Sequence, residues 1–254
     1  MYLLKNRYLY FAFIFLLCFS SCKSKKWIVK EYSSTKIAID SSKDAIADKE
    51  YTTYLQPFKQ AMDEQMSVII GQSAKAMPVS RPESLLSNFF TDACKEIASQ
   101  YLNEKVDISI MNMGGIRTDM PQGNITVGDI FRIMPFENEL TILWLKGDKL
   151  QELCNVIAQV GGEGVSGIKM GIKEGKAVNA LVNGEKIDKE KIYTIATNDY
   201  LAGGNDKLVQ LAEYVKREDT GLKLRDALIE YIREQTKNGK QLDSQMEGRI
   251  YYQN

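Results

Sequence analysis

The fold is decided by residues 80–117, which read SRPESLLSNFFTDACKEIASQYLNEKVDISIMNMGGIR. Ser80 and Glu83 have the spacing of a capping box, with Pro82 in the first turn, so a helix is predicted to begin there. Apolar residues then recur every fourth position in two adjacent rows: Leu85, Phe89, Ala93, Ile97 and Tyr101 beside Leu86, Phe90 and Cys94. This spacing predicts an amphipathic helix that packs on a core.

A strand and a glycine loop follow this helix. Val106, Ile108 and Ile110 alternate with polar residues, which predicts a strand, and Gly114 and Gly115 end it. The same patterns predict helices at residues 50–70, 128–134, 148–159 and 222–235, and strands at residues 140–145, 168–172, 177–182 and 191–196, with a tight hairpin turn at Asn183 and Gly184. Because helices and strands interleave without a repeat, we expect one α+β domain over residues 49–254, with a mixed sheet and packed helices.

The composition excludes several classes of function. The 254 residues include 33 Lys and Arg, 33 Asp and Glu, and no His. This balanced charge gives no sign of a nucleic-acid surface, so no nucleic-acid polymer is expected as a partner. Without His, the common His-rich sites for zinc, manganese or di-iron cannot be built from this chain, and no calcium-loop spacing is present. A magnesium or calcium site built from carboxylates alone stays open on composition. We assign no metal site, no cofactor and no catalytic residue to this chain.

The N-terminus has the features of a targeting signal. A basic start precedes an apolar run at residues 8–19 that is short for a membrane span, which predicts a signal peptide over residues 1–21. Small residues precede Cys22, as in a bacterial lipobox, so Cys22 is predicted to carry lipid and to hold the protein at a membrane of the cell envelope. Residues 22–48 form a lead segment in which residues 27–40 could supply an edge strand. The alternatives are a plain signal peptide with an incidental cysteine and a short membrane anchor.

Two further cysteines lie within the predicted domain. Cys94 and Cys154 each fall inside a helical pattern. The sequence is compatible with two buried thiols and also with one disulfide, because spacing alone does not decide between them.

Two loops carry residue types that core packing does not require. In residues 112–117, paired glycines allow main-chain N–H groups to approach a ligand, and Arg117 offers a planar cation to an anion. In residues 135–138, Phe136 can stack on a base and Asn138 can hydrogen-bond its edge. Each loop also has a plainer explanation, namely a solvated arginine or a phenylalanine in the core.

Two further segments add to this set. Residues 197–206 place Tyr200 near Asp206, whose carboxylate can accept hydrogen bonds from two sugar hydroxyls, although a polar surface turn would look similar. Arg81 stands at the predicted start of the long helix, where an anion is favoured, although it could equally be solvated. Taken together, two ring faces, two arginines and a carboxylate describe a site shaped for a nucleotide.

The order of these motifs over residues 50–251 resembles the C-terminal domain of the 5'-nucleotidase family. The motifs include NMGGIR at 112–117, GNITVGD at 123–129, PFEN at 135–138, SG at 166–167, YLAGGND at 200–206 and EGRI at 247–250. In that family, this domain binds the nucleotide and an N-terminal metallophosphoesterase domain hydrolyses it.

The resemblance implies a role for seven residues. They are Phe136 and Tyr200 around the base, Asn138 and Gly167 beside it, Asp206 at the ribose, and Arg81 and Arg117 at the phosphate. Three positions depart from the family pattern. Met77 stands where an arginine is usual, Tyr200 replaces the commoner Phe, and the glycine pair before Asp206 comes one residue early.

The resemblance covers the ligand-binding half of the family alone. The family's metal ions and catalytic pair rest on Asp, His and Asn residues of the N-terminal domain, and this chain has no His. We therefore expect a ligand-binding unit that works with a separately encoded metallophosphoesterase, with divalent metal ions in that partner only. Two alternatives stay open: an envelope lipoprotein that binds nucleosides or nucleotides without a partner enzyme, and a structural envelope lipoprotein.

Overall fold

In the computed structural model, the long predicted helix is α3 (Leu85–Leu102), and it begins at a different cap from the predicted one. Ser84 is the N-cap, and its hydroxyl accepts a hydrogen bond from the main-chain N–H of Ser87. The Glu83 carboxylate accepts main-chain N–H groups from the C-terminal segment instead. The capping box predicted at Ser80 is therefore wrong, because Glu83 is committed to another part of the chain.

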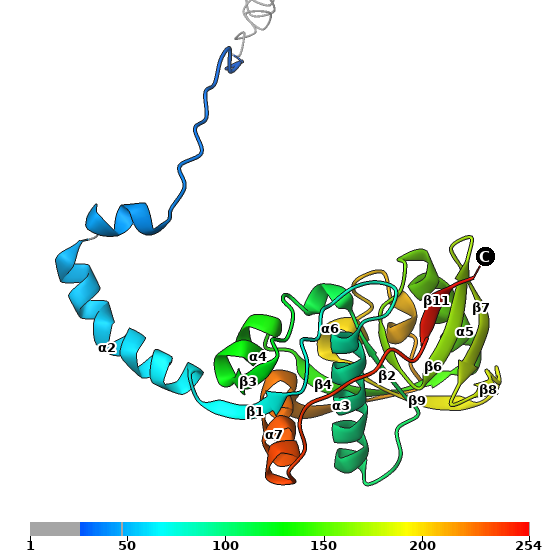
Figure 1. The fold of residues 1–254 in the computed structure, drawn as a ribbon. Helices are drawn as coiled ribbons and strands as arrows, with labels where there is room; N and C mark the ends of the chain where they lie inside the picture. Colours follow the sequence, from blue (N-terminus) through cyan, green and yellow to red (C-terminus); the bar gives the residue numbers. More distant parts are fainter. Residues whose placement is uncertain (1–25, 47, 254) are drawn as a thin grey trace, which may run out of the picture. The chain divides into compact units, whose positions relative to one another are not determined.

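A five-stranded mixed sheet lies beside α3 (Figure 1). Its strands, in spatial order, are β10 (Lys216–Lys223), β4 (Glu139–Lys146), β9 (Ile192–Asn198), β2 (Ile108–Met111) and β5 (Gly164–Ser166). β2 and β9 run parallel, and the other neighbouring pairs run antiparallel. The predicted α+β class with a mixed sheet is confirmed.

The two faces of this sheet cover separate cores. Side chains alternate along β4, so that Ile142 belongs to the first core and Leu143 to the second. The first core is covered by α3, α4 (Val127–Ile133) and α7 (Leu224–Lys237), and α3 and α7 lie side by side (Figure 1). The second core is covered by α5 (Gly147–Gln159) and by a second sheet.

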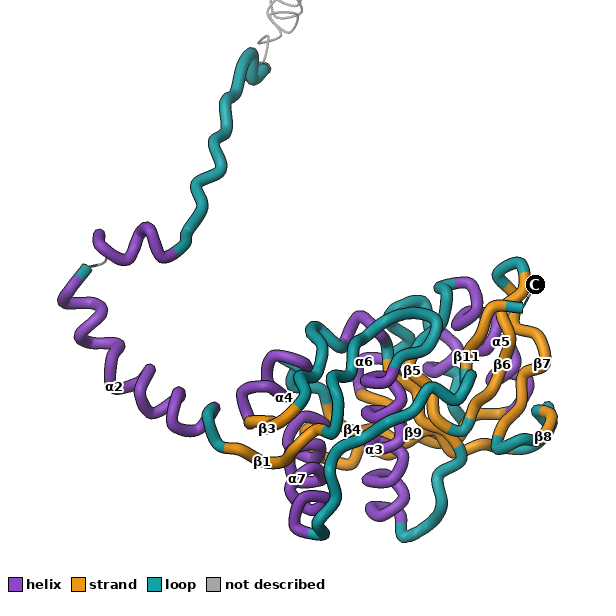
Figure 2. The backbone as a smooth tube through the Cα atoms, in the orientation of Figure 1, coloured by secondary structure: helices purple, strands orange, loops and turns teal. Residues whose placement is uncertain are grey.

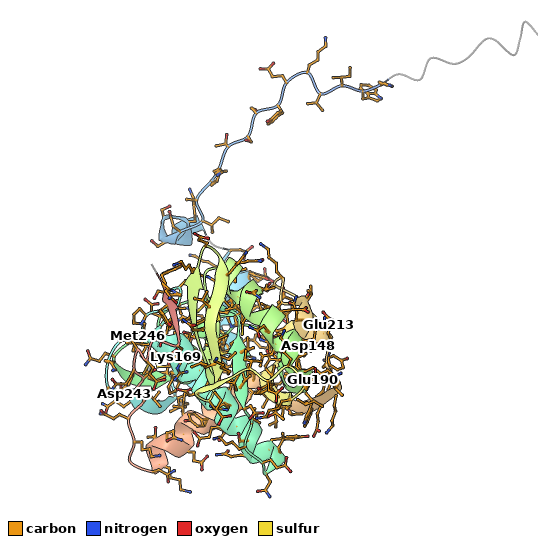
Figure 3. All side chains as sticks on the ribbon, turned by 90° about the vertical axis from the view of Figure 1, so that its right-hand side faces the viewer. Asp148, Lys169, Glu190, Glu213, Asp243 and Met246 are labelled. Carbon is orange, nitrogen blue, oxygen red and sulfur yellow. The ribbon has the colours of Figure 1, made fainter. Side chains whose placement is uncertain are left out.

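The second sheet has four strands that gather at one end of the fold (Figure 2). In spatial order they are β11 (Ile250–Tyr252), β6 (Ile168–Lys173), β7 (Lys176–Val182) and β8 (Glu185–Lys186). The short helix η3 (Val209–Ala212) packs on α5, and Lys149 pairs with Glu213 at 2.9 Å. Glu213 lies on the same side of the domain as Asp148, at the start of α5 (Figure 3).

The first predicted helix is too long at its C-terminal end. The helix α2 (Lys49–Met66) ends before residue 70, and β1 (Ile69–Ser73) follows it. β1 pairs antiparallel with β3 (Gly123–Thr126), a strand that the sequence patterns did not predict. Ile70 is buried in the first core. The β-branched residues Ile69 and Ile70 therefore form a strand because they pair with β3, although the residues before them have helical spacing.

The structure describes residues 26–46 and 48–253, so the predicted signal peptide and Cys22 lie outside the described residues. Contacts divide the chain into two units, Met1–Thr52 and Thr53–Asn254. In the first unit, residues 26–39 have no regular secondary structure, and the 3-10 helix η1 (Ser41–Ile46) follows. The suggested edge strand at residues 27–40 is therefore not formed. In residues 26–46 and 48–253, no helix is both long enough and apolar enough to cross a membrane.

Cys94 and Cys154 are both free and buried. Cys94 belongs to the first core and Cys154 to the second, so the central sheet lies between them. Burial raises the pKa of the Cys94 thiol to about 11 and that of the Cys154 thiol to about 12. Of the two arrangements that the sequence left open, the structure has two buried thiols.

Candidate functional site

Three loops meet at one edge of the five-stranded sheet. β2 and β9 are parallel neighbours, so the loops that follow them leave from the same edge. β4 runs antiparallel to β9, with Leu140 opposite Asn198, so the loop that precedes β4 also reaches this edge. The topology therefore brings together residues 112–117, 135–138 and 197–206, which are far apart in sequence.

These loops line a pocket of about 340 Å³, within the size range of small-molecule sites. Its wall consists of Asn112, Gly114, Gly115, Arg117, Phe136, Asn138, Tyr200 and Asp206. Five of the seven residues predicted to contact a ligand are in this set. Phe136 and Tyr200 are 47% and 44% exposed as residues, so neither is sealed in the core.

The loop after β9 begins with the short helix α6 (Asp199–Ala202), which is tied to the neighbouring loop. The Asp199 carboxylate accepts from the main-chain N–H of Tyr200 at 2.9 Å and from that of Glu139 at 3.0 Å. Asn205 donates from its carboxamide to the main-chain carbonyl of Tyr200 at 2.8 Å. One carboxylate thus fixes the residue that carries the aromatic ring to the start of β4.

Asp206 is held by two donors from different loops. Its carboxylate accepts from the Asn112 carboxamide at 2.5 Å and from the Tyr200 hydroxyl at 2.9 Å. The hydrogen bond to Asp206 is the main cause that raises the pKa of Tyr200, because it stabilises the protonated phenol. Each carboxylate oxygen can accept a further hydrogen bond. A Cβ at Gly115 would stand 2.9 Å from Asn112 Oδ1, so glycine there leaves room for this arrangement.

Arg117 is held at the pocket by contacts of both its main chain and its side chain. Its main-chain N–H donates to the carbonyl of Ile133, at the end of α4, at 2.8 Å. Its guanidinium donates to the Gly114 carbonyl at 3.0 Å and lies 5.8 Å from the centroid of the Phe136 ring. The 3-10 helix η2 (Met113–Gly115) forms the turn between these contacts. A cation and an aromatic face therefore share one wall of the pocket.

Arg81 does not line this pocket. Its guanidinium donates to Glu163 at 2.8 Å, and the other oxygen of that carboxylate accepts the main-chain N–H of Met113. Glu163 is only 4% exposed, and burial raises the pKa of its carboxyl, although both donors oppose this shift. Because α3 begins after Ser84, Arg81 is not at a helix N-terminus, and its observed partner is a buried carboxylate.

Gly167 also lies outside the pocket. It joins β5 to β6 with a φ of +81°, and a Cβ there would stand 2.2 Å from the carbonyl oxygen of Asp107. It lines a separate cavity of about 460 Å³ with Lys169 and Arg249. Gly167 therefore lies close to the main chain of Asp107. Its position gives no support to the expectation that it lies beside the base.

The sequence patterns missed three residues that position the wall. The patterns place Asn112 in a loop without a role, and they assign no role to Glu163 or Asp199. Asn112 and Asp199 are polar residues that directly follow β2 and β9, and this position is the signal that could have identified them. Glu163 precedes the short strand β5, which the sequence patterns do not predict. Their partners lie far away in the sequence, so those contacts could not be read from spacing.

The side chains of the pocket wall are of types that bind a ligand by hydrogen bonds and charge. In residues 26–46 and 48–253, no group of three or more His, Cys, Asp or Glu side chains is placed to hold a metal ion. The polar groups at the pocket are a carboxylate, carboxamides, a phenol and a guanidinium. They can accept hydrogen bonds from hydroxyls, donate to ring nitrogens and pair with an anion.

A family model described as 5'-nucleotidase, C-terminal domain, matches residues 65–213, which is more than half of the chain. The chain belongs to this family. The 5'-nucleotidase of Vibrio cholerae is 24% identical over 191 residues, which cover 73% of this chain and 34% of that protein. Endonuclease YhcR of Bacillus subtilis is 30% identical over 227 residues, which cover 83% of this chain and 18% of that protein. The chain thus spans about a third or less of the length of these two relatives.

Solved structures show the same fold. The 5'-nucleotidase precursor of Thermus thermophilus matches with a TM-score of 0.70 and 28% identity. The match covers 80% of the present chain and 43% of the Thermus chain. The NAD nucleotidase of Haemophilus influenzae matches with a TM-score of 0.61 at 23% identity, over 81% of this chain and 41% of that one, which shows the fold alone. The chain therefore resembles the nucleotide-binding half of 5'-nucleotidases.

Proposed function

We propose that this domain binds the nucleoside part of a nucleotide in the pocket between the three loops, and that it supplies this binding to a separately encoded metallophosphoesterase. The proposal is carried by the pocket wall, in which two open aromatic rings, a carboxylate, a carboxamide and a guanidinium converge. Family membership supports the same ligand class.

The aromatic pair accounts for the base. Phe136 and Tyr200 each present about half of their surface to solvent at the pocket, although rings of this size are normally buried. Stacking on a base covers such a ring without demanding one particular base, and it contributes about 1–3 kcal/mol per base. Asn138 offers both a donor and an acceptor to the base edge.

The polar side of the pocket accounts for the sugar and the phosphate. Asp206 is pre-oriented by Asn112 and Tyr200 and keeps free lone pairs for two vicinal hydroxyls. Arg117 supplies a planar cation for a phosphate. The hydroxyls and the phosphate belong to the same ligand, so its orientation in the pocket would be fixed at both ends.

The partner and the location extend the same proposal. The matched family domain is a C-terminal one, and the sequence has no His with which to build the usual metal centre, so hydrolysis is assigned to a second chain that carries the divalent metal ions. Lipid on Cys22 would hold the complex at the bacterial cell envelope, on the periplasmic face or the cell surface.

A calorimetric titration of the full chain in mild detergent tests the ligand. We expect the wild-type protein to bind adenosine, and Phe136→Ala to weaken binding by about 5- to 150-fold, which is the loss of one stacking face. Phe58→Ala is the matched control, because Phe58 lies on α2 and is 62% exposed outside the pocket wall. Absence of adenosine binding, or equal losses in both variants, would refute the proposed site.

A separate assay tests the partner. Phosphate release from 5'-AMP by a metallophosphoesterase of the same organism is measured with and without this chain. We expect the chain to raise the rate, and the Phe136→Ala variant to raise it less than the Phe58→Ala variant does. A rate that the wild-type chain leaves unchanged with every candidate enzyme would refute the complex while leaving the binding site standing.

One observation favours a second candidate, a nucleoside-binding lipoprotein without a partner enzyme. Arg81 is paired with the buried Glu163, and Met77, where the family usually has an arginine, is completely buried. Arg117 is therefore the sole guanidinium in the wall of this pocket. For this candidate, adenosine should bind as tightly as 5'-AMP, whereas tighter binding of 5'-AMP that weakens with salt would favour the nucleotide.

A further inference from the structure

The loop that presents Phe136 and Asn138 rests on the first turn of α7. The main-chain N–H of Leu224 donates to the Asn138 carbonyl at 2.9 Å. This contact satisfies one of the free N–H groups at the start of a helix whose N-cap residue, Lys223, makes no side-chain cap. A main-chain hydrogen bond therefore joins the 135–138 loop to α7, although about ninety residues separate them.

Arg225 reaches the same loop with its side chain. One guanidinium nitrogen donates to the Pro135 carbonyl at 3.3 Å, and the other donates to the Glu137 carboxylate at 3.2 Å. These two residues flank Phe136 on either side. The Arg225 guanidinium lies 3.9 Å from the ring centroid of Phe131, which belongs to α4. It thus fills the space between α7, α4 and the loop.

This position is unfavourable for an arginine in three ways. Arg225 is 6% exposed, and its Nε has no hydrogen-bond partner within the described part of the chain. It also stands in the first turn of α7, where the helix dipole disfavours a cation. Glu137 offsets little of this, because its side chain is 74% exposed and an exposed partner contributes weakly. An apolar side chain of similar length would fill this space without these penalties.

We propose that Arg225 is a positioning residue that holds the 135–138 loop so that the Phe136 ring faces the pocket. The proposal rests on the function proposed above, because it assigns Phe136 to the base. Arg225 itself is not in the wall of the pocket, so it acts through the loop and touches no ligand. Its planar fork suits this role, because one group can grip the main chain before Phe136 and the side chain after it.

The chain offers a matched control on the same helix. Arg233 also belongs to α7, but its side chain is 45% exposed and it pairs with Glu230 within the helix. Arg225→Met and Arg233→Met therefore remove the same charge from the same element. Arg225→Lys is the conservative variant, which keeps the charge and one donor nitrogen but loses the planar fork.

The first measurement is adenosine affinity of the full chain. We expect Arg225→Met to weaken adenosine binding about tenfold and Arg225→Lys to weaken it less. Arg233→Met should bind adenosine as tightly as the wild type. In a Phe136→Ala background, Arg225→Met should weaken binding by less than about twofold further, because both changes remove the same contact. Losses that multiply in the double variant would overturn the proposal, since Arg225 would then act independently of Phe136.

The second measurement needs no ligand. Amide hydrogen exchange at residues 136–138 should be faster in Arg225→Met than in Arg233→Met, while exchange in α3 stays the same in both. Should Arg225→Met fail to fold, the comparison is made with Arg225→Lys. If the wild-type chain binds no adenosine, the proposed function fails. If it binds and Arg225→Met equals Arg233→Met in both measurements, the positioning role alone fails.

Discussion

Gly167→Ala tests whether this glycine serves the fold or the ligand. The resemblance to the 5'-nucleotidase family placed Gly167 beside the base, whereas the structure places it against the main chain of Asp107. An added methyl group would stand 2.2 Å from the Asp107 carbonyl oxygen. Asp107 cannot move away easily, because its main-chain N–H and its carboxylate are both hydrogen-bonded to Thr194 on β9.

The expected loss follows from two contributions. A residue with a Cβ at a φ of +81° is strained by about 1–2 kcal/mol. Overpacking against fixed main chain adds about 1–3 kcal/mol. The variant Gly175→Ala separates the backbone strain from the overpacking. The φ of Gly175 is +71° and nothing lies within 4 Å of its Cβ position, so this variant has the strain without the clash.

Urea denaturation followed by circular dichroism gives the free energy of unfolding of both variants. We expect Gly167→Ala to lose about 1–3 kcal/mol more than Gly175→Ala, or roughly 2–12 °C in Tm for a domain of this size. Adenosine affinity of folded Gly167→Ala should equal that of the wild type. Equal stabilities of the two variants, combined with weaker adenosine binding by Gly167→Ala alone, would show that the glycine serves the ligand.

Two further predictions concern buried ionisable groups. The raised pKa of Glu163 means that its protonated form favours folding, so this contribution is complete below pH 4.5 and is lost as the pH rises through the raised value. The free energy of unfolding of the wild type minus that of Glu163→Gln should therefore fall over this range, and a flat difference would contradict the burial of the carboxylate. The buried thiols of Cys94 and Cys154 should resist alkylation at about pH 8 in the native chain and react in guanidinium, with mass spectrometry locating the label, and native labelling would show that the cores open.

The elements with long, regular apolar spacing could be predicted from the sequence. The helices α3, α5 and α7 and the strand β4 lie close to their predicted ranges, because each buries one face or both against a core. Short strands such as β3, β5 and β11 could not be predicted. They have few residues, and they exist because a distant partner pairs with them.

The candidate site could be predicted in its parts but not in its connections. Phe136, Tyr200 and Asp206 stand in loops whose residue types suit a ligand, and the topology brings them together. Arg81 looked equally suitable, but the sequence gives no sign that Glu163 would pair with it across eighty-two positions. Contacts of this kind depend on the folded arrangement, so sequence patterns do not contain them.

The edge of the sheet where the three loops meet has a consequence for how such proteins diversify. The loops project beyond the strand ends, so replacing a side chain at Phe136, Asn138 or Tyr200 disturbs neither core. Selection can therefore alter the chemistry of the pocket wall while the scaffold persists.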